Sequence, residues 1–180
     1  MPIKAPKIRI ASPAGSAPYG RGFYQLEEET LYLPIEYQDE KPRFFSFLES
    51  DTVSMQFDRE GRLIFIELTL PRHHWIVRPE VCLPRTAGPG DIRFLDFREE
   101  MANPIISCDQ FRQNIHIEFS SLIPVSAIYL SKNLIAQISS DDFLVAVWAT
   151  DIVEDLAGRE FASWRKMIRA GQRQLASIAF

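Results

Sequence analysis

The sequence contains little cysteine and little histidine, with two cysteines and three histidines among 180 residues. Cys82 and Cys108 show no CxxC spacing, so they do not indicate a disulfide framework. We interpret both as buried, unreactive thiols. Because an isolated pair of thiols is typical of a reducing compartment, the sequence predicts a cytoplasmic protein.

Long apolar runs are also missing. No run approaches the roughly 18 residues that a membrane-spanning helix needs, and the N-terminus lacks the apolar core of a signal peptide. The formal net charge of −4 is too small to indicate general attraction to nucleic acid or anionic membranes. There is no GxSxG motif and no phosphate-binding loop. The sequence therefore predicts no catalytic residue, no cofactor and no membrane partner.

Aromatic residues are abundant, with 13 Phe, 5 Tyr and 3 Trp, and the hydrophobic fraction is 46%. Such a composition suits strands and a sizeable core. The clearest strand signal is a hairpin over residues 52–68. Apolar residues alternate with polar ones over 53–57, a turn with Asp and Gly follows at 58–61, and 63–66 is almost wholly apolar. The second strand is therefore predicted to be buried on both faces.

The rest of the chain predicts a mainly β protein of the α+β class, built from antiparallel meanders. Residues 1–22 are rich in proline and glycine and predict an extended arm, either solvated or added to a partner's sheet. Residues 23–180 are predicted to form a single domain. Residues 30–37 read as a strand, and Pro34 indicates that this strand lies at an edge or carries a bulge. The Pro-rich connection 71–110 is expected to cross between sheets or to line a groove.

The two halves of the domain look alike. When 23–70 is compared with 111–150 at a shift of 81 positions, apolar residues and the hairpin turn coincide, with few identities. A duplication would give two similar sheets packed face to face and related by a pseudo-twofold axis. Any two β-meanders can agree in this way, so both duplication and chance likeness remain open.

Residues 23–70 also carry a recognisable order of short strand segments: Leu31-Tyr-Leu33, Val53, Phe57-Asp58, Gly61-Arg62-Leu63 and Ile66-Glu67-Leu68. This order resembles a small bacterial domain family of unknown function, in which an LY(I/V) strand precedes a V–D–D–G–R–L–GIEI hairpin. The chain departs from that pattern at 54–56, which lack the first acidic residue, and at Phe65, where the family tends to have Gly. The family has no settled activity, so the resemblance implies a fold and little else.

A period of 3.6 residues replaces the period of two after Thr150 and predicts an amphipathic helix over about 151–171. Asp151 or Asp155 is the expected N-cap, and Gly171 the expected end. The predicted apolar face comprises Ala157, Phe161, Trp164, Ile168 and Leu175.

Opposite that face, Arg165, Arg169 and Arg173 form a basic stripe. We interpret the stripe as a solvated face, with weak nucleic-acid binding as the alternative. No aromatic residues interleave with these arginines and the chain is acidic overall, so nucleic acid is not the favoured partner.

The most conspicuous polar cluster is the segment Arg72-His73-His74-Trp75. We interpret it either as an exposed loop or as a ligand-contact loop where cation, imidazole and indole meet. A metal site is disfavoured, because adjacent residues of an extended segment point to opposite sides. Glu67, at the end of the buried strand, is a candidate for a raised pKa, and a solvated strand end is the alternative.

These features favour a non-catalytic binding or interaction module that self-associates, most simply as a homodimer. The predicted edge at 31–37 motivates self-association. One alternative is a small-ligand binder or enzyme that uses Arg72, His73, His74, Trp75 and Glu67. The other is weak nucleic-acid binding through the C-terminal helix.

Overall fold

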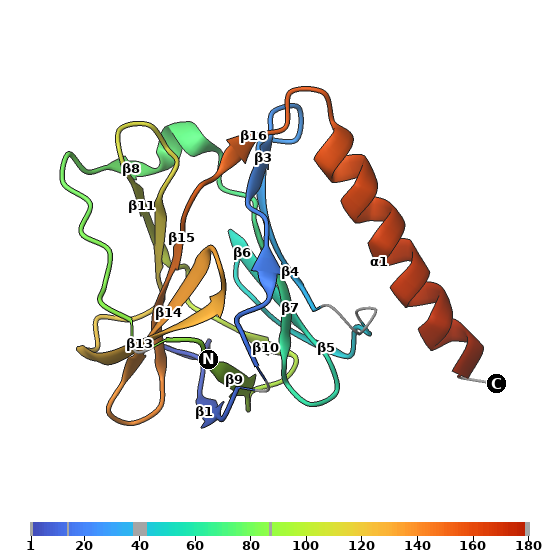
Figure 1. Cartoon of the computed structure of the whole chain (residues 1–180), viewed down its shortest axis with the longest axis horizontal. Coiled ribbons are helices and arrows are strands. Elements are labelled where there is room, and N and C mark those ends of the chain that lie inside the picture. The colour runs from blue at the N-terminus through green and yellow to red at the C-terminus, as the bar shows by residue number, and fades with distance from the viewer. Residues whose placement is uncertain (1, 14, 38–42, 87, 179–180) are drawn as a thin grey trace.

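The computed structural model describes residues 2–13, 15–37, 43–86 and 88–178, but not the side chains of residues 168 and 170–178. Two β-sheets pack face to face, and one helix lies against the outer side of the first sheet (Figure 1). The predicted mainly β fold with a C-terminal helix is confirmed. Apolar side chains from the facing sides of both sheets form the main core, because alternate strand residues point inward.

The elements divide among two sheets, a ribbon and two helices. The first sheet contains β2 (Tyr19–Gly20), β3 (Phe23–Gln25), β4 (Thr30–Glu36), β5 (Ser46–Glu49), β6 (Val53–Phe57), β7 (Leu63–Leu68), β10 (Glu99–Glu100) and β16 (Val153–Glu154). The second contains β8 (Ile76–Val77), β11 (Ile105–Cys108), β12 (Ile115–Glu118), β13 (Pro124–Ser131), β14 (Leu134–Ser139) and β15 (Leu144–Ala149). The ribbon is β1 (Ile8–Ala11) with β9 (Asp91–Phe94), and the helices are the 3-10 turn η1 (Arg72–His74) and α1 (Arg159–Ile178).

The main strands of the two sheets follow the same order. The first sheet runs β5-β6-β7-β4-β3, and the second runs β13-β14-β15-β12-β11. The hairpin registers also agree at a shift of 81 residues: Val53 pairs with Leu68, and Leu134 pairs with Ala149. Both hairpins carry a register shift at the same place, directly after Gln56 and Gln137. The sheets thus share order and register, whereas their origin by duplication stays a prediction.

The chain crosses between the sheets more than once, and two of these crossings are alike. After β7 of the first sheet, the chain passes to β8, which pairs in parallel with β11 of the second sheet. After β15 of the second sheet, it passes to β16, which pairs in parallel with β3 of the first. Each half therefore contributes its last strand to the other sheet. The connection 71–110 crosses between the sheets, which is one of its two expected roles.

The described part of residues 1–22 is extended, but the prediction of a solvated arm is wrong. β1 pairs antiparallel with β9, and Ile8 is only 1% exposed. β2 pairs with β4 of the first sheet. Residues 8–11 include apolar side chains, and Ile8 is buried in the core. The high proline and glycine content of the segment led to the prediction of a solvated arm.

The strand at 30–37 is not a sheet edge, so that expectation is also wrong. β4 lies between β7 on one side and β3 with β2 on the other. Pro34 lies opposite the break between those two short strands, where the chain passes from the Phe23–Tyr32 pair to the Gly20–Ile35 pair. A residue without an N–H group fits at such a break, because the regular ladder is interrupted there. The predicted basis for self-association at this strand is removed.

The helix begins later and ends later than predicted. Residues 153–154 form β16, and α1 starts at Arg159. The buried carboxylate of Asp155 accepts hydrogen bonds from the backbone N–H groups of Glu160 (3.2 Å) and Phe161 (2.9 Å), so Asp155 caps the helix, as one of the two expected caps. The helix continues past Gly171 to Ile178.

One face of α1 packs on the first sheet. The Trp164 ring lies 4.8 Å from the Phe65 ring, edge-on, and the Phe161 ring lies 5.2 Å from the Tyr32 ring. Ala157 is exposed and precedes the helix, so it does not belong to this face. The side chains of Ile168 and Leu175 lie outside the described residues. The predicted burial of both thiols is right for Cys108, whose pKa burial raises, and wrong for the exposed Cys82.

Candidate functional site

A cavity of about 390 Å³ opens between the two sheets, beside the ribbon of β1 and β9. Three separate parts of the chain enclose it: residues 13 and 15–18, strands β4 and β7 of the first sheet with their adjoining residues, and residues 89–92 with β13. Its lining residues are Pro13, Gly15, Ser16, Ala17, Pro18, Ile35, Tyr37, Arg62, Leu63, Pro89, Gly90, Asp91, Ile92 and Leu130. Because sequence-distant segments meet here, the cavity depends on the whole fold.

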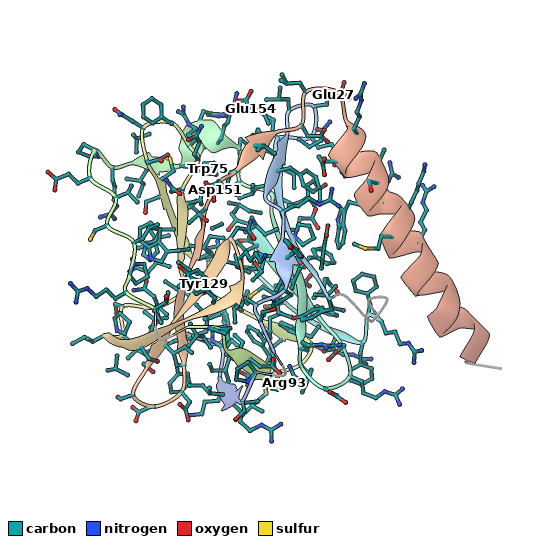
Figure 2. All side chains as sticks on the ribbon, viewed as in Figure 1. Glu27, Trp75, Arg93, Tyr129, Asp151 and Glu154 are labelled. Atoms are coloured by element: carbon teal, nitrogen blue, oxygen red, sulfur yellow. The ribbon has the colours of Figure 1, made fainter. Side chains whose placement is uncertain are left out.

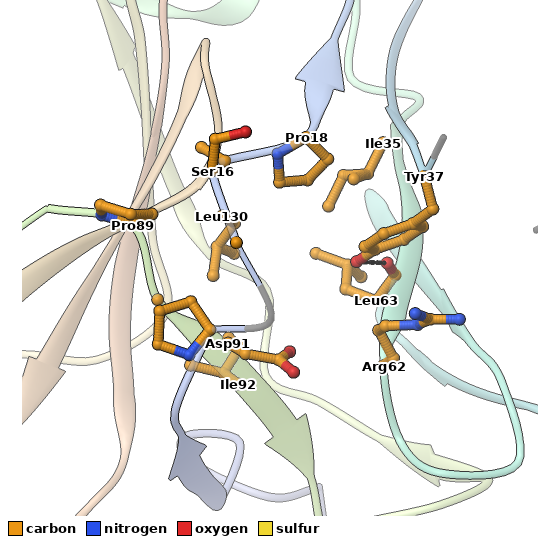
Figure 3. A pocket seen from close by; sticks show the side chains of 14 residues that line it. Ser16, Pro18, Ile35, Tyr37, Arg62, Leu63, Pro89, Asp91, Ile92 and Leu130 are labelled. Atoms are coloured by element: carbon orange, nitrogen blue, oxygen red, sulfur yellow. Dashed lines mark hydrogen bonds between the residues drawn. The ribbon is translucent and has the colours of Figure 1, made fainter. Parts of the chain in front are cut away.

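Aliphatic side chains form two opposite walls of the cavity, and about half of its surface is polar. Figure 3 shows Ile35 and Leu63 on the side of the first sheet, and Leu130 and Ile92 on the opposite side. Those four side chains also belong to the main core or flank it, and each is at most 6% exposed. The cavity is therefore a gap in the packing between the sheets, with buried core side chains on both sides.

Tyr37 supplies a polar group at one end of this cavity. Its hydroxyl donates a hydrogen bond of 2.8 Å to the carbonyl oxygen of Leu63. The Arg62 guanidinium lies 4.2 Å from the centre of the Tyr37 ring, and its Nε donates to Asp58 at 3.0 Å. Burial raises the pKa of Tyr37, so the phenol remains protonated and keeps its bond to Leu63 at neutral pH.

Asp91, the first residue of β9, supplies the second polar group. Figure 3 shows its carboxylate pointing into the cavity. The guanidinium of Arg93 forms an ion pair with Oδ1 of Asp91, and both side chains are largely shielded from solvent. Burial raises the pKa of Asp91, while the charges of Arg93 and Arg62 oppose that rise.

The structure divides the predicted ligand-contact loop: Arg72 and Trp75 line one cavity, whereas His73 and His74 line neither cavity. Arg72, His73 and His74 form η1, but Trp75 belongs to the core and is only 4% exposed. Its indole Nε1 donates to the carbonyl oxygen of Leu70 at 2.9 Å, and its ring meets the Tyr24 ring edge-on at 5.5 Å. The role of Trp75 is therefore packing, because both its apolar surface and its N–H group are used inside the protein.

A second, smaller cavity of about 290 Å³ lies next to this turn. Its lining residues are Tyr24, Arg72, Trp75, Phe111, Arg112, Gln113, Ile152, Val153 and Glu154. Arg72 forms an ion pair with Glu154, so the two similar crossings, from β7 to β8 and from β15 to β16, are joined here. Figure 2 shows Glu154 near the end of the molecule with β8 and β16, and Arg93 toward the opposite end. The two cavities thus lie in different parts of the molecule.

The two histidines of the turn stay outside both cavities. Their rings lie 4.1 Å apart, both are exposed, and Nδ1 of His73 is 3.9 Å from a carboxylate oxygen of Glu29. Across the described ranges, no group of three or more His, Cys, Asp or Glu side chains could hold a metal ion. The exposed-loop interpretation therefore fits His73 and His74.

Glu67 lies on the helix-covered face of the first sheet, paired across the strands with Tyr32 and Ser54. Burial, and next the charge of Glu28, raise its pKa in the predicted direction. It lines neither cavity, so it does not join the residues of the turn.

The basic stripe lies on the outside of α1. Arg165 and Arg169 are exposed, and the Arg165 guanidinium packs 5.4 Å from the Phe161 ring. The Arg173 side chain lies outside the described residues. The two described arginines fit the solvated-face interpretation.

No family model and no curated protein matches the sequence. The resemblance of residues 23–70 to the small bacterial domain family therefore stays a prediction. Within the described ranges, none of the helices combines the length and the apolar character that crossing a membrane requires.

Sequence reasoning missed the residues of the larger cavity. Gly88-Pro-Gly90-Asp91 reads as a turn, and Tyr37 reads as a strand end. One signal was present: Asp91 opens a strand whose alternate residues Ile92 and Phe94 are apolar, so a carboxylate stands next to a core segment. Nothing in the sequence indicated that residues 13 and 15–18 would line the same cavity.

Proposed function

We propose that this protein is a non-catalytic binding module that holds a small molecule in the larger cavity. The observation that carries the proposal is the cavity itself, whose volume of about 390 Å³ falls within the range of roughly 300–1,000 Å³ typical of ligand sites. Its apolar wall supplies affinity, and a few polar groups at one end supply orientation. Asp91 and Tyr37 are each bonded to a neighbour, an arrangement suited to orienting a ligand.

Thermal unfolding with a library of acidic, basic and neutral fragments tests this proposal. A fragment at a hundred times its Kd stabilises the folded state by about 2.7 kcal/mol, which raises Tm measurably. The variant Ala17→Phe fills the cavity from the surface segment and should abolish the response, because Ala17 lies in its lining. Ser16→Trp is a second way to fill the same space.

The matched control is Ala157→Phe, at an exposed position before α1, which should respond like the wild type. If no fragment stabilises the wild type, or if both filled variants respond as the wild type does, the proposal is wrong. Circular dichroism of each variant checks that it is folded.

A separate observation favours self-association. Leu122, Ile123 and Val125 are 44%, 81% and 64% exposed; the first two precede β13, an edge strand of the second sheet, and Val125 lies at its start. Contiguous exposed apolar side chains at a strand edge are typical of protein–protein contacts. We expect light scattering to give a dimer that Ile123→Glu dissociates. A wild-type monomer at high concentration would contradict this.

Observations in the structure also support two other predictions, the internal duplication and the cytoplasmic location. The shared strand order and hairpin register support an internal duplication of the halves 23–70 and 111–150. The free thiols of Cys82 and Cys108 support a cytoplasmic location, where thiols remain reduced.

A further inference from the structure

The arginines near the larger cavity are already engaged by groups of the protein. The Arg62 guanidinium packs on the Tyr37 ring and binds Asp58, and Figure 3 shows it directed away from Asp91. The Arg93 guanidinium binds Asp91 and is not part of the cavity lining. An anionic ligand would therefore have to break an existing ion pair to gain a cation.

The polar end of the cavity offers hydrogen-bond acceptors. The Asp91 carboxylate points into the cavity, and the ion pair with Arg93 uses only its Oδ1. Among the described residues, no hydrogen bond reaches Oδ2 of Asp91. The Tyr37 hydroxyl gives its proton to Leu63, so its oxygen can only accept from a ligand. A ligand that fits must bring N–H or O–H donors to this end.

The charge of Asp91 selects among such donors. A partly buried carboxylate is less well solvated than a free one, and a cation that donates a hydrogen bond to it compensates that loss more than a neutral donor does. A ligand carboxylate or phosphate would meet a like charge at the same place and would be rejected.

We propose that the larger cavity binds an amphiphilic organic amine, with its protonated nitrogen at Asp91 and Tyr37 and its apolar body against Ile35, Leu63 and Leu130. This inference rests on the proposed function and names its ligand class. The apolar body can be alkyl or aryl, because the side chains proposed to contact it are aliphatic.

Three probes with one apolar body and different heads test the inference by calorimetric titration: 3-phenylpropylamine, 3-phenylpropan-1-ol and 3-phenylpropanoic acid. We expect the wild type to bind the amine at least about tenfold more tightly than the alcohol, and to show no heat of binding with the acid. Asp91→Asn should remove the preference for the amine while keeping the affinity for the alcohol. The matched control Asp141→Asn, at an exposed position, should behave as the wild type.

The outcomes separate the two proposals. If the probes bind and Ala17→Phe blocks them, but the acid or the alcohol binds as tightly as the amine, the ligand class is wrong and the binding site stands. If Asp91→Asn keeps the preference for the amine, the inference is also overturned, because Asp91 is its central group. If the amine does not bind at millimolar concentration while other fragments do, the amine inference is wrong and the proposed binding site stands. If no probe and no fragment binds, both proposals fall.

Discussion

The two cavities of this protein use their polar residues in opposite ways. In the smaller cavity, Arg72 pairs with Glu154, and Trp75 gives its N–H group to the backbone, so the polar groups hold the two crossings together. In the larger cavity, the Asp91 carboxylate points inward and Tyr37 presents an oxygen. The comparison teaches that residues conspicuous in the sequence can serve structure, whereas less conspicuous ones can form the better binding site.

The largest expected effect tests the structural role of Trp75. Trp75→Ala should lower the free energy of unfolding by about 3–5 kcal/mol, because it removes a buried indole and leaves a hole against Tyr24. Urea denaturation measures this loss. The neighbouring exposed residue gives the control: His74→Ala should change stability by no more than about 0.5 kcal/mol. Similar losses from both changes would break the contrast between core and loop.

A smaller effect is expected at the larger cavity. Tyr37→Phe removes the hydrogen bond to Leu63 and should cost about 1 kcal/mol of stability, since the ring itself remains. Tyr19→Phe, at a ring that is 51% exposed, is the control and should be nearly neutral. Chemical denaturation of the two variants side by side measures the difference. A neutral Tyr37→Phe would mean that the hydroxyl is not held by Leu63.

Glu67 should give a change in stability that depends on pH. Burial and the charge of Glu28 raise its pKa in the folded state, so folding favours the protonated form. The wild type should lose stability as pH rises from the ordinary glutamate range through the raised pKa. Glu67→Gln should therefore be the more stable protein at neutral pH, with the difference vanishing in acid.

Denaturation curves across that pH range check this prediction. The exposed control Glu27→Gln should follow the wild type at every pH. If Glu67→Gln is less stable than the wild type at neutral pH, Glu67 makes favourable contacts as a carboxylate, and the account of its burial is wrong.

The smallest effect is expected for the ion pair of the smaller cavity. The Arg72 and Glu154 side chains are 33% and 48% exposed, so solvent screens the pair. A double-mutant cycle with Arg72→Ala and Glu154→Ala should give a coupling energy of about 0–1 kcal/mol. A much larger coupling energy would mean that this ion pair, and not the packing of Trp75, is the main interaction that holds the two crossings together.

The strands and the helix could be predicted because their signals are local. The alternation over 53–57, the apolar run 63–66 and the helical period after residue 150 each reflect one face turned to the core. The position of a strand within its sheet is not a local property. Pro34 indicated an edge or a bulge, and only the three-dimensional pairing put β4 between two neighbours.

The candidate site depended even more on tertiary structure. Arg72 to Trp75 stand together in the sequence, but the fold turns Trp75 into the core and leaves His73 and His74 in solvent. Residues of the larger cavity come from segments more than a hundred positions apart, such as Ser16 and Leu130. Such an arrangement arises because the chain crosses between the sheets. The strands at two of these crossings, β8 and β16, have only two residues each, too few to give a recognisable sequence pattern.

The most direct test of the central claim is an amide NMR titration of the wild-type protein with 3-phenylpropylamine. If the larger cavity is the binding site, shifts should gather at its lining residues, such as Ser16, Gly90 and Asp91. The amides of Gln113 and Val153, which line the smaller cavity, should stay in place. Shifts that gather at the smaller cavity, or no shifts at millimolar probe, would contradict the account.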